Sequence, residues 1–247
     1  MEPKRGERLC ALLGYGALLK EMGQHAEARR VFLKAVRRAK RQGRRRQAAE
    51  AHHDLLAIEA ERGTIAKAVV HAVQALELYP QQHPYLPALA HELGFLLVRL
   101  GHYSTAIPLL ELAVPRAARP AVEALEWSTL AWAAAGAGRR QRYEVAEREA
   151  LRLVGLHDEY GPAVMLHLAE GARSLGQWTR AERYATHAAE AAARRGDATL
   201  KAEAEDLFQI IAEHQDAPDD CVPPDAVRIE TFTTRLAARL RGWKAQP

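Results

Sequence analysis

The residues best suited to chemistry are histidines that stand beside carboxylates. His53-Asp54 is followed 38 residues later by His91-Glu92, and His167 with Glu170 forms a third group of this kind. Imidazole nitrogens and carboxylate oxygens are the ligands of divalent metals, and imidazoles titrate near neutral pH. Metal binding, acid–base catalysis and the binding of a cation are therefore the chemistries to weigh.

Motifs of known enzymes are missing from the sequence. There is no GxxxxGK[ST] phosphate loop, no GxSxG elbow and no HExxH zinc helix. Gly14-Tyr-Gly16 and Gly136-Ala-Gly138 are fragments of a dinucleotide fingerprint, but neither follows a strand pattern. No nucleophile and base have a spacing that favours covalent catalysis. The prediction is a protein that is not an enzyme and that uses no cofactor.

Regular glycines reveal the elements that must position these histidines. Five helix-breaking turns, spaced 40, 38, 37 and 38 residues apart, contain Gly23, Gly63, Gly101, Gly138 and Gly176. Stretches of about 15 residues with apolar positions at i, i+3, i+4 and i+7 flank each turn, which is the helical period. Glycine adopts the left-handed conformation that ends one helix and lets the next fold back. The repeated unit is therefore helix–turn–helix.

Similar residues recur at fixed offsets from each glycine. They are Leu12, Tyr15-Gly16, Leu19, Ala28, Phe32 and Ala35; His52, Leu55-Leu56, Ala68, Ala72, Ala75 and Pro80; Ala90, Leu93-Gly94, Leu97, Ala106 and Leu110; Trp127 and Leu130-Ala131; and Met165, Leu168-Ala169, Ala181, Ala185 and Ala188. This pattern resembles that of the tetratricopeptide repeat family. The fourth unit departs from the pattern at Tyr143 and Glu147. The long period is similar to that of repeats in bacterial transcriptional regulators and peptide-sensing proteins.

The resemblance implies an all-α, right-handed superhelical solenoid with a capping helix and a C-terminal helix. The expected repeats cover 7–41, 44–80, 84–118, 120–154 and 159–195, and a capping helix over 197–214, opened by Asp197, completes a domain spanning 1–214. A Pro/Asp-rich linker over 215–228 leads to an amphipathic helix over 229–247. This last helix either docks on its own array or serves dimerisation or a partner's groove.

The family's first helices line a concave groove, which the resemblance places as the partner-binding site. The expected groove residues are His53, Asp54, His91, Glu92, Phe95, Arg99, Ser128, Trp132, His167, Glu170 and Arg173. Stacked helices lie about 8–10 Å apart, which is wide for shared metal ligation, so no metal site is predicted. The family's two-carboxylate clamp uses Lys and Asn, whereas Leu13 and Ala17 occupy those places. A peptide or helix of a partner protein, cationic or amphipathic, is the expected ligand.

Charge is distributed unevenly along the chain. Residues 1–46 carry 14 basic and 4 acidic side chains, although the whole chain has a net charge of only +4. A basic patch in this region consists of Arg37, Arg38, Lys40, Arg41, Arg44, Arg45 and Arg46. Such a patch can release counterions from a phosphate backbone, but no aromatic residue interleaves with it for base stacking. A nucleic-acid-associated regulatory protein is therefore the alternative function.

Location is predicted from what the sequence lacks. Leu9 to Leu19 looks like the apolar part of a signal peptide, yet no small-residue cleavage site follows, so a first amphipathic helix is expected. No apolar run approaches the ~18–20 residues that cross a bilayer. Cys10 and Cys221 lie far apart and form no zinc or disulfide pattern. These features favour the cytoplasm.

Overall fold

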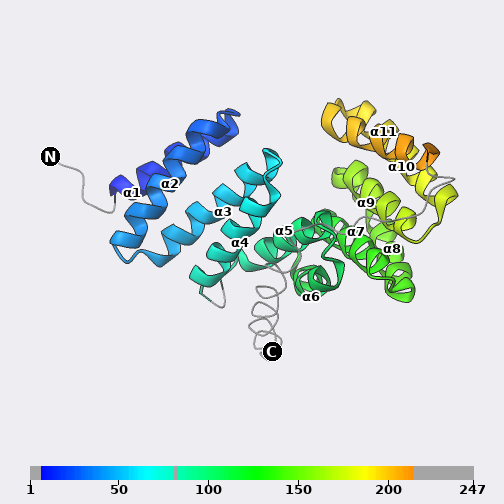
Figure 1. Cartoon of the computed structure of the whole chain (residues 1–247), viewed down its shortest axis with the longest axis horizontal. Helices are drawn as coiled ribbons and strands as arrows, with labels where there is room; N and C mark the ends of the chain where they lie inside the picture. The colour runs from blue at the N-terminus through cyan, green and yellow to red at the C-terminus, as the bar shows by residue number, and fades with distance from the viewer. Residues whose placement is uncertain (1–6, 81–82, 214–247) are drawn as a thin grey trace. The chain divides into compact units, whose positions relative to one another are not determined.

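In the computed structural model, residues 7–80 and 83–213 are described, and the regular elements of this part of the chain are α-helices and two single 3-10 turns. Figure 1 shows the helices in chain order. They are α1 (Glu7–Glu21), α2 (His25–Arg41), α3 (Arg45–Glu61), α4 (Ile65–Leu78), α5 (Leu86–Arg99), α6 (Tyr103–Ala113), α7 (Pro120–Gly136), α8 (Arg140–Val154), α9 (Gly161–Ser174), α10 (Trp178–Arg195) and α11 (Ala198–Glu213). The 3-10 turns are η1 (Val114–Arg116) and η2 (Asp158–Tyr160). The predicted linker over 215–228 and helix over 229–247 lie outside the described residues.

Glycine turns join the helices into antiparallel hairpins. The five glycines expected there have φ between +67° and +77°, the left-handed region that favours glycine. In the first turn Gly23 donates its N–H to Lys20 O at 2.9 Å, and Gln24 donates to Leu19 O at 2.8 Å. This is the Schellman pattern, which satisfies carbonyls that the helix end would otherwise leave free. The predicted helix–turn–helix arrangement is thus confirmed.

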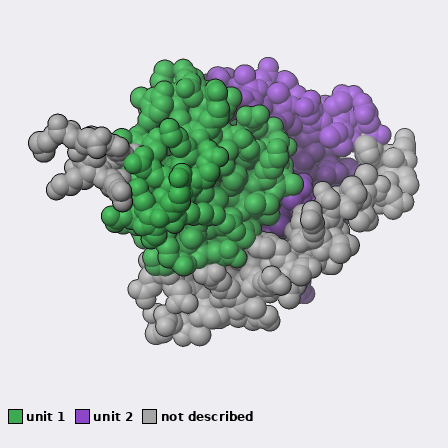
Figure 2. All heavy atoms as spheres, turned by 60° about the vertical axis from the view of Figure 1, so that its left-hand side comes forward, with its two compact units in different colours: residues 1–96 green, residues 97–247 purple. Residues whose placement is uncertain are grey.

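The chain forms two compact units, residues 1–96 and 97–247, which Figure 2 colours separately. In unit 1, α1 packs on α2, α2 packs on α3 and α3 packs on α4. Gly16 of α1 lets the Phe32 ring approach, because a Cβ at this glycine would stand 2.9 Å from that ring. Close contact between the helices buries Phe32 completely and fixes the first hairpin.

Unit 2 repeats the same packing, with α7 against α8, α7 against α9 and α9 against α10. Its departure from the repeat pattern has a structural reason. Tyr143 replaces a small residue, and its buried ring fits because Gly171 of α9 lacks a side chain: a Cβ there would stand 2.9 Å from Tyr143 Cε2. Tyr143 donates its hydroxyl hydrogen to Glu147 at 2.6 Å. The two unusual residues therefore form one buried polar pair.

Helix α11 packs on α10 and, less extensively, on α9. It starts where the sequence indicates, because Leu200 donates its backbone N–H to Asp197 Oδ1 at 3.0 Å. Ala204, Leu207 and Ile211 are its buried residues, and their spacing forms one narrow apolar stripe. The stripe covers the last hairpin, as an end cap of a repeat array must.

Helix α1 is helical as expected but not clearly amphipathic. Leu9 and Leu19 are buried against α2 and α3, yet Tyr15, Leu18 and Met22 are exposed on the other side. Apolar residues therefore occupy both faces, and the expectation of an amphipathic first helix is wrong in this respect. The apolar run that looks like a signal sequence is explained by this two-sided composition.

Candidate partner-binding groove

Unit 1 contains a hollow of about 550 Å³ that we call the unit 1 hollow. Most of its lining comes from the first helices of successive hairpins. The lining residues are Leu13, Ala17 and Lys20 from α1, Glu50, His53, Asp54 and Ala57 from α3, Tyr79 and Tyr85 from the segment that follows α4, and Glu92 from α5. Its volume is within the range of about 300–1,000 Å³ that is typical of ligand pockets.

Ion pairs tie the helices around the unit 1 hollow together. Lys20 Nζ of α1 lies 2.6 Å from Asp54 Oδ1 of α3, and His53 Nε2 of α3 lies 2.9 Å from Glu92 Oε2 of α5. Burial alone lowers the pKa of His53, but the hydrogen bond and charge of Glu92, helped by Asp54, outweigh it and raise this pKa. The adjacent first helices α3 and α5 therefore bring an imidazole and a carboxylate into direct contact.

Aromatic rings form one wall of the unit 1 hollow. Tyr79 stacks on His83 with ring centroids 4.2 Å apart, and Tyr85 meets Tyr79 edge-on at 6.4 Å. His53 contacts both tyrosines edge-on, at 6.2 and 6.1 Å. Tyr79 is only 4% exposed, and its hydroxyl has no hydrogen-bond partner among the described residues. Burial, followed by the charges of Glu50 and Asp54, raises the pKa of Tyr79, so its phenol stays neutral.

Only part of the hollow's lining could be predicted from the sequence. Of the expected groove residues, His53, Asp54 and Glu92 line it, as do Leu13 and Ala17 from the positions of the family's clamp. The missed residues are Lys20, Glu50, Ala57, Tyr79 and Tyr85. The two tyrosines come from the connection between hairpins, outside the first helices. The aromatic cluster around Pro80 and Pro84 was the available signal, because aromatic residues are otherwise scarce in this chain.

The other expected groove residues of α5 are not part of the unit 1 hollow. His91 and Phe95 are partly buried on that helix, whereas Arg99 at its end is exposed. Burial lowers the pKa of His91 to about 4, so its imidazole is neutral at physiological pH. The charge of Glu92 acts on both imidazoles, but burial outweighs it at His91, whereas the added hydrogen bond to Glu92 raises the pKa of His53.

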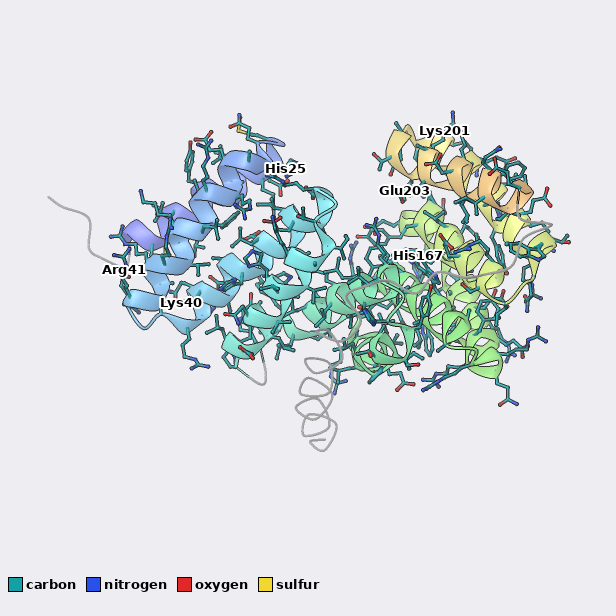
Figure 3. The ribbon with its side chains drawn as sticks, in the orientation of Figure 1. His25, Lys40, Arg41, His167, Lys201 and Glu203 are labelled. Carbon is teal, nitrogen blue, oxygen red and sulfur yellow. The ribbon has the colours of Figure 1, made fainter. Side chains whose placement is uncertain are left out.

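In unit 2 the expectation of an open lining is wrong for two residues. Ser128 of α7 and His167 of α9 are 0% and 7% exposed, and Figure 3 shows His167 among the helices of this unit. Ser128 Oγ lies 3.2 Å and Thr129 Oγ1 lies 3.1 Å from His167 Nδ1. The imidazole thus joins α7 to α9 inside the structure. It is a buried hydrogen-bonding group rather than one that meets a partner.

The remaining expected residues of unit 2 surround this buried group. The Trp132 ring tilts against that of His167 with centroids 5.7 Å apart, and it is partly buried. Arg173 Nε lies 2.9 Å from Glu170 Oε2 on the same helix. Two of the expected groove residues therefore form an ion pair with each other.

The basic patch surrounds the turn between α2 and α3. All its residues except Arg38 are exposed, and Figure 3 shows Lys40 and Arg41 at the end of α2. Arg46 pairs with Glu50 at 2.9 Å, and Arg45 donates to the carbonyl oxygen of Glu77 at 3.2 Å. The patch therefore directs most of its cations to solvent.

Metal coordination would need more ligands than these helices bring together. His52 Nδ1 of α3 and His71 Nδ1 of α4 lie 3.0 Å apart, and burial lowers the pKa of His52 to about 4. Across residues 7–80 and 83–213, however, no three side chains of His, Cys, Asp or Glu gather closely enough to hold an ion. The two imidazoles form a hydrogen bond in which one neutral ring donates and the other accepts.

Known proteins share the arrangement of paired helices described above. Residues 7–81 match the family model described as tetratricopeptide repeat. This part of the chain therefore resembles the tetratricopeptide repeat family. Proteins of this family generally mediate protein–protein interactions and are typically not enzymes. No curated protein matches the chain as a relative.

Solved structures share this fold over most of the chain. YrrB, described as having an unusual peptide-binding site, is 15% identical with a TM-score of 0.54, covering 79% of this chain and 90% of its own. A thermophilic protein of this family from Thermus thermophilus is 21% identical with a TM-score of 0.54, covering 81% and 99%. MamA from Desulfovibrio magneticus RS-1 is 18% identical with a TM-score of 0.53, covering 88% and 100%. At such identities the likeness concerns the fold.

None of the helices in the part of the chain that the structure describes has the length and apolar character needed to cross a bilayer.

Proposed function

We propose that this chain is a non-catalytic adaptor that holds a peptide or helix of a partner protein in the groove of unit 1. The unit 1 hollow carries the proposal, because its lining combines the apolar side chains of Leu13, Ala17 and Ala57 with charged and aromatic side chains. Binding sites generally place a few polar groups in a mainly apolar concavity. The fold that the chain shares with YrrB, described as a protein with a peptide-binding site, supports the same use.

Selection of linear peptides from a displayed library on the full-length protein tests the adaptor role. The variant Ala57→Arg would fill the hollow with a long side chain and should weaken the selected peptides at least about tenfold, measured by fluorescence anisotropy. Ala66→Arg is the matched control, because Ala66 is exposed on α4 and does not line the hollow. Peptides that bind the Ala57→Arg protein as tightly as the wild type would show that the groove is not their site.

A second candidate function, nucleic-acid association, is favoured by the basic patch and its exposure to solvent. A mixed-sequence oligonucleotide should then bind more weakly as salt rises, with a log–log slope of about 0.9 for each phosphate contact on duplex DNA. The triple variant Arg37→Gln/Arg41→Gln/Arg44→Gln should lower that slope. The control Arg139→Gln/Arg148→Gln/Arg183→Gln removes equal charge from exposed sites elsewhere and should not change it. Absence of binding at about 50 mM salt, a condition that strengthens phosphate contacts, would exclude this function.

A further inference from the structure

We propose that the unit 1 hollow is an anchor site for an arginine side chain of the bound partner. This inference rests on the adaptor function and specifies the chemistry of its ligand. Its first support is charge. The hollow is lined by three carboxylates, Glu50, Asp54 and Glu92, against one lysine, Lys20, and one histidine, His53. Arg46, which lies outside the lining, also pairs with Glu50, so a cation entering the hollow meets a surplus of one negative charge when His53 is neutral.

The three carboxylates of the hollow can each accept a further hydrogen bond. Each internal ion pair engages one oxygen: Oε1 of Glu50, Oδ1 of Asp54 and Oε2 of Glu92. The second oxygen of each carboxylate has no hydrogen bond to any side chain in residues 7–80 and 83–213. Ionised carboxylates accept several hydrogen bonds, and charge-assisted bonds to guanidinium are among the strongest that proteins make. An arginine can therefore bind without displacing the pairs that hold the helices.

Tyr79 gives an independent indication that a polar group binds here. Its side chain lines the hollow and is 4% exposed, yet its hydroxyl oxygen has no partner among the described residues. A buried polar group without a partner is costly, and such groups in native proteins usually have a functional reason. A guanidinium N–H donated to this oxygen would supply the missing hydrogen bond.

The shape of the wall favours arginine over lysine. Tyr85 is 51% exposed and stands edge-on to both Tyr79 and His53, so part of its ring remains accessible. A guanidinium is planar, stacks on aromatic faces and offers five donors in a fixed fork, whereas an ammonium is a strongly hydrated point charge. The acceptors come from α3, α5 and the Tyr79 segment. Separate acceptors of this kind suit the several donors of a guanidinium better than the single charge of an ammonium group.

His53 makes the site sensitive to pH. It faces Glu92 across the helices, Asp54 on its own helix, Lys20 on α1, and the rings of Tyr79 and Tyr85. Protonated His53 adds a positive charge to the hollow, and its loss as pH rises leaves the carboxylates uncompensated. Arginine should therefore bind more tightly above the raised pKa of His53 than below it.

A titration with N-acetyl-arginine methylamide tests the anchor, with the full-length protein carrying ¹³C-labelled tyrosine and histidine. The ring signals of His53, Tyr79 and Tyr85 should shift and saturate. The citrulline analogue is nearly identical in shape but uncharged, and it should bind at least about tenfold more weakly because it lacks the charge-assisted bonds. The lysine analogue should bind severalfold more weakly than arginine. Equal affinity for arginine and citrulline, or tighter binding of N-acetyl-aspartate methylamide, would overturn the proposal.

Variants separate binding from folding. Tyr79→Phe removes only the hydroxyl, and it should lower the affinity for N-acetyl-arginine methylamide. The midpoint of thermal unfolding should stay unchanged or rise, because the variant lacks the unsatisfied buried group. Glu50→Gln should lower this affinity as well. The control Glu144→Gln, which changes an exposed residue of α8, should leave it unchanged. Undiminished arginine binding by both Tyr79→Phe and Glu50→Gln would contradict the anchor.

The two proposals can fail separately. Selected peptides that lose affinity in Ala57→Arg but keep it when their arginines are replaced by citrulline would refute the anchor and leave the adaptor function standing. Peptides that bind the Ala57→Arg variant with unchanged affinity would refute the adaptor function, even if N-acetyl-arginine methylamide binds in the hollow.

Discussion

Replacing Glu147 by alanine should lower the free energy of unfolding of unit 2 by about 3–4 kcal/mol. The carboxylate is 8% exposed and joins α8 to α10. It accepts hydrogen bonds from Tyr143 at 2.6 Å, from Tyr184 at 2.9 Å and from Arg180 at 3.3 Å. The variant leaves two buried hydroxyls and a guanidinium without their acceptor, and such orphaned groups are more costly than the average hydrogen bond is stabilising.

Urea unfolding followed by tryptophan fluorescence measures this loss selectively. All four tryptophans lie beyond residue 96, so unit 1 contributes no tryptophan signal. Glu144→Ala is the matched control, because Glu144 is exposed on the same helix and its removal should change stability by less than about 0.5 kcal/mol. A loss below about 1 kcal/mol for Glu147→Ala would mean that the network is not a structural link.

Coupling gives a sharper form of the same test. In the double variant Glu147→Ala/Tyr143→Phe, the hydroxyl that lost its acceptor is itself removed, so the combined loss should be smaller than the sum of the single losses. An interaction energy of about 1 kcal/mol or more is expected for groups in one network. Strict additivity would show that Tyr143 and Glu147 act independently in spite of their contact.

The hairpin architecture could be predicted from the sequence because its determinants are local. A glycine such as Gly23 adopts a left-handed conformation that other residues resist, and Asp197 caps a helix through its own next turn. These signals act within four or five residues of chain, and they recur at one period. Helix positions and fold class therefore follow from the sequence without knowledge of long-range contacts.

The site could be predicted only in part because its determinants are not local. His53 and Glu92 were expected on one surface through the repeat period, and they meet at 2.9 Å. Tyr79 and Tyr85 enter the hollow from a connection whose path no periodicity specifies. The period placed His167 with the groove residues, but it does not reveal that Ser128 and Thr129 surround the ring inside the structure. The helical period predicts which face of a helix a residue occupies. Whether that residue is buried depends on how the neighbouring helix packs against this face.

Glu126 should make the stability of unit 2 fall as pH rises. This α7 residue is 2% exposed, and its Oε2 is buried without a hydrogen-bond partner in the described part of the chain. Burial, followed by the nearby charge of Glu123, raises the pKa of Glu126 from 4.5 to about 7. Because the folded state holds the proton more tightly than the unfolded state, the stabilisation is complete below pH 4.5 and is lost as pH rises through 7. The loss between about pH 5 and pH 8 should be about 2 kcal/mol.

The variant Glu126→Gln removes the titration and keeps the size of the side chain. It should flatten this pH dependence and exceed the wild type by about 2 kcal/mol at pH 8, with little difference at pH 4. Urea midpoints from tryptophan fluorescence at pH 4, 6 and 8 measure the effect, and Glu144→Gln, which changes charge equally at an exposed site, should keep the wild-type slope. If Glu126→Gln and the wild type lose stability in parallel as pH rises, then Glu126 is not the group responsible. A parallel loss would place the cause in another group of unit 2.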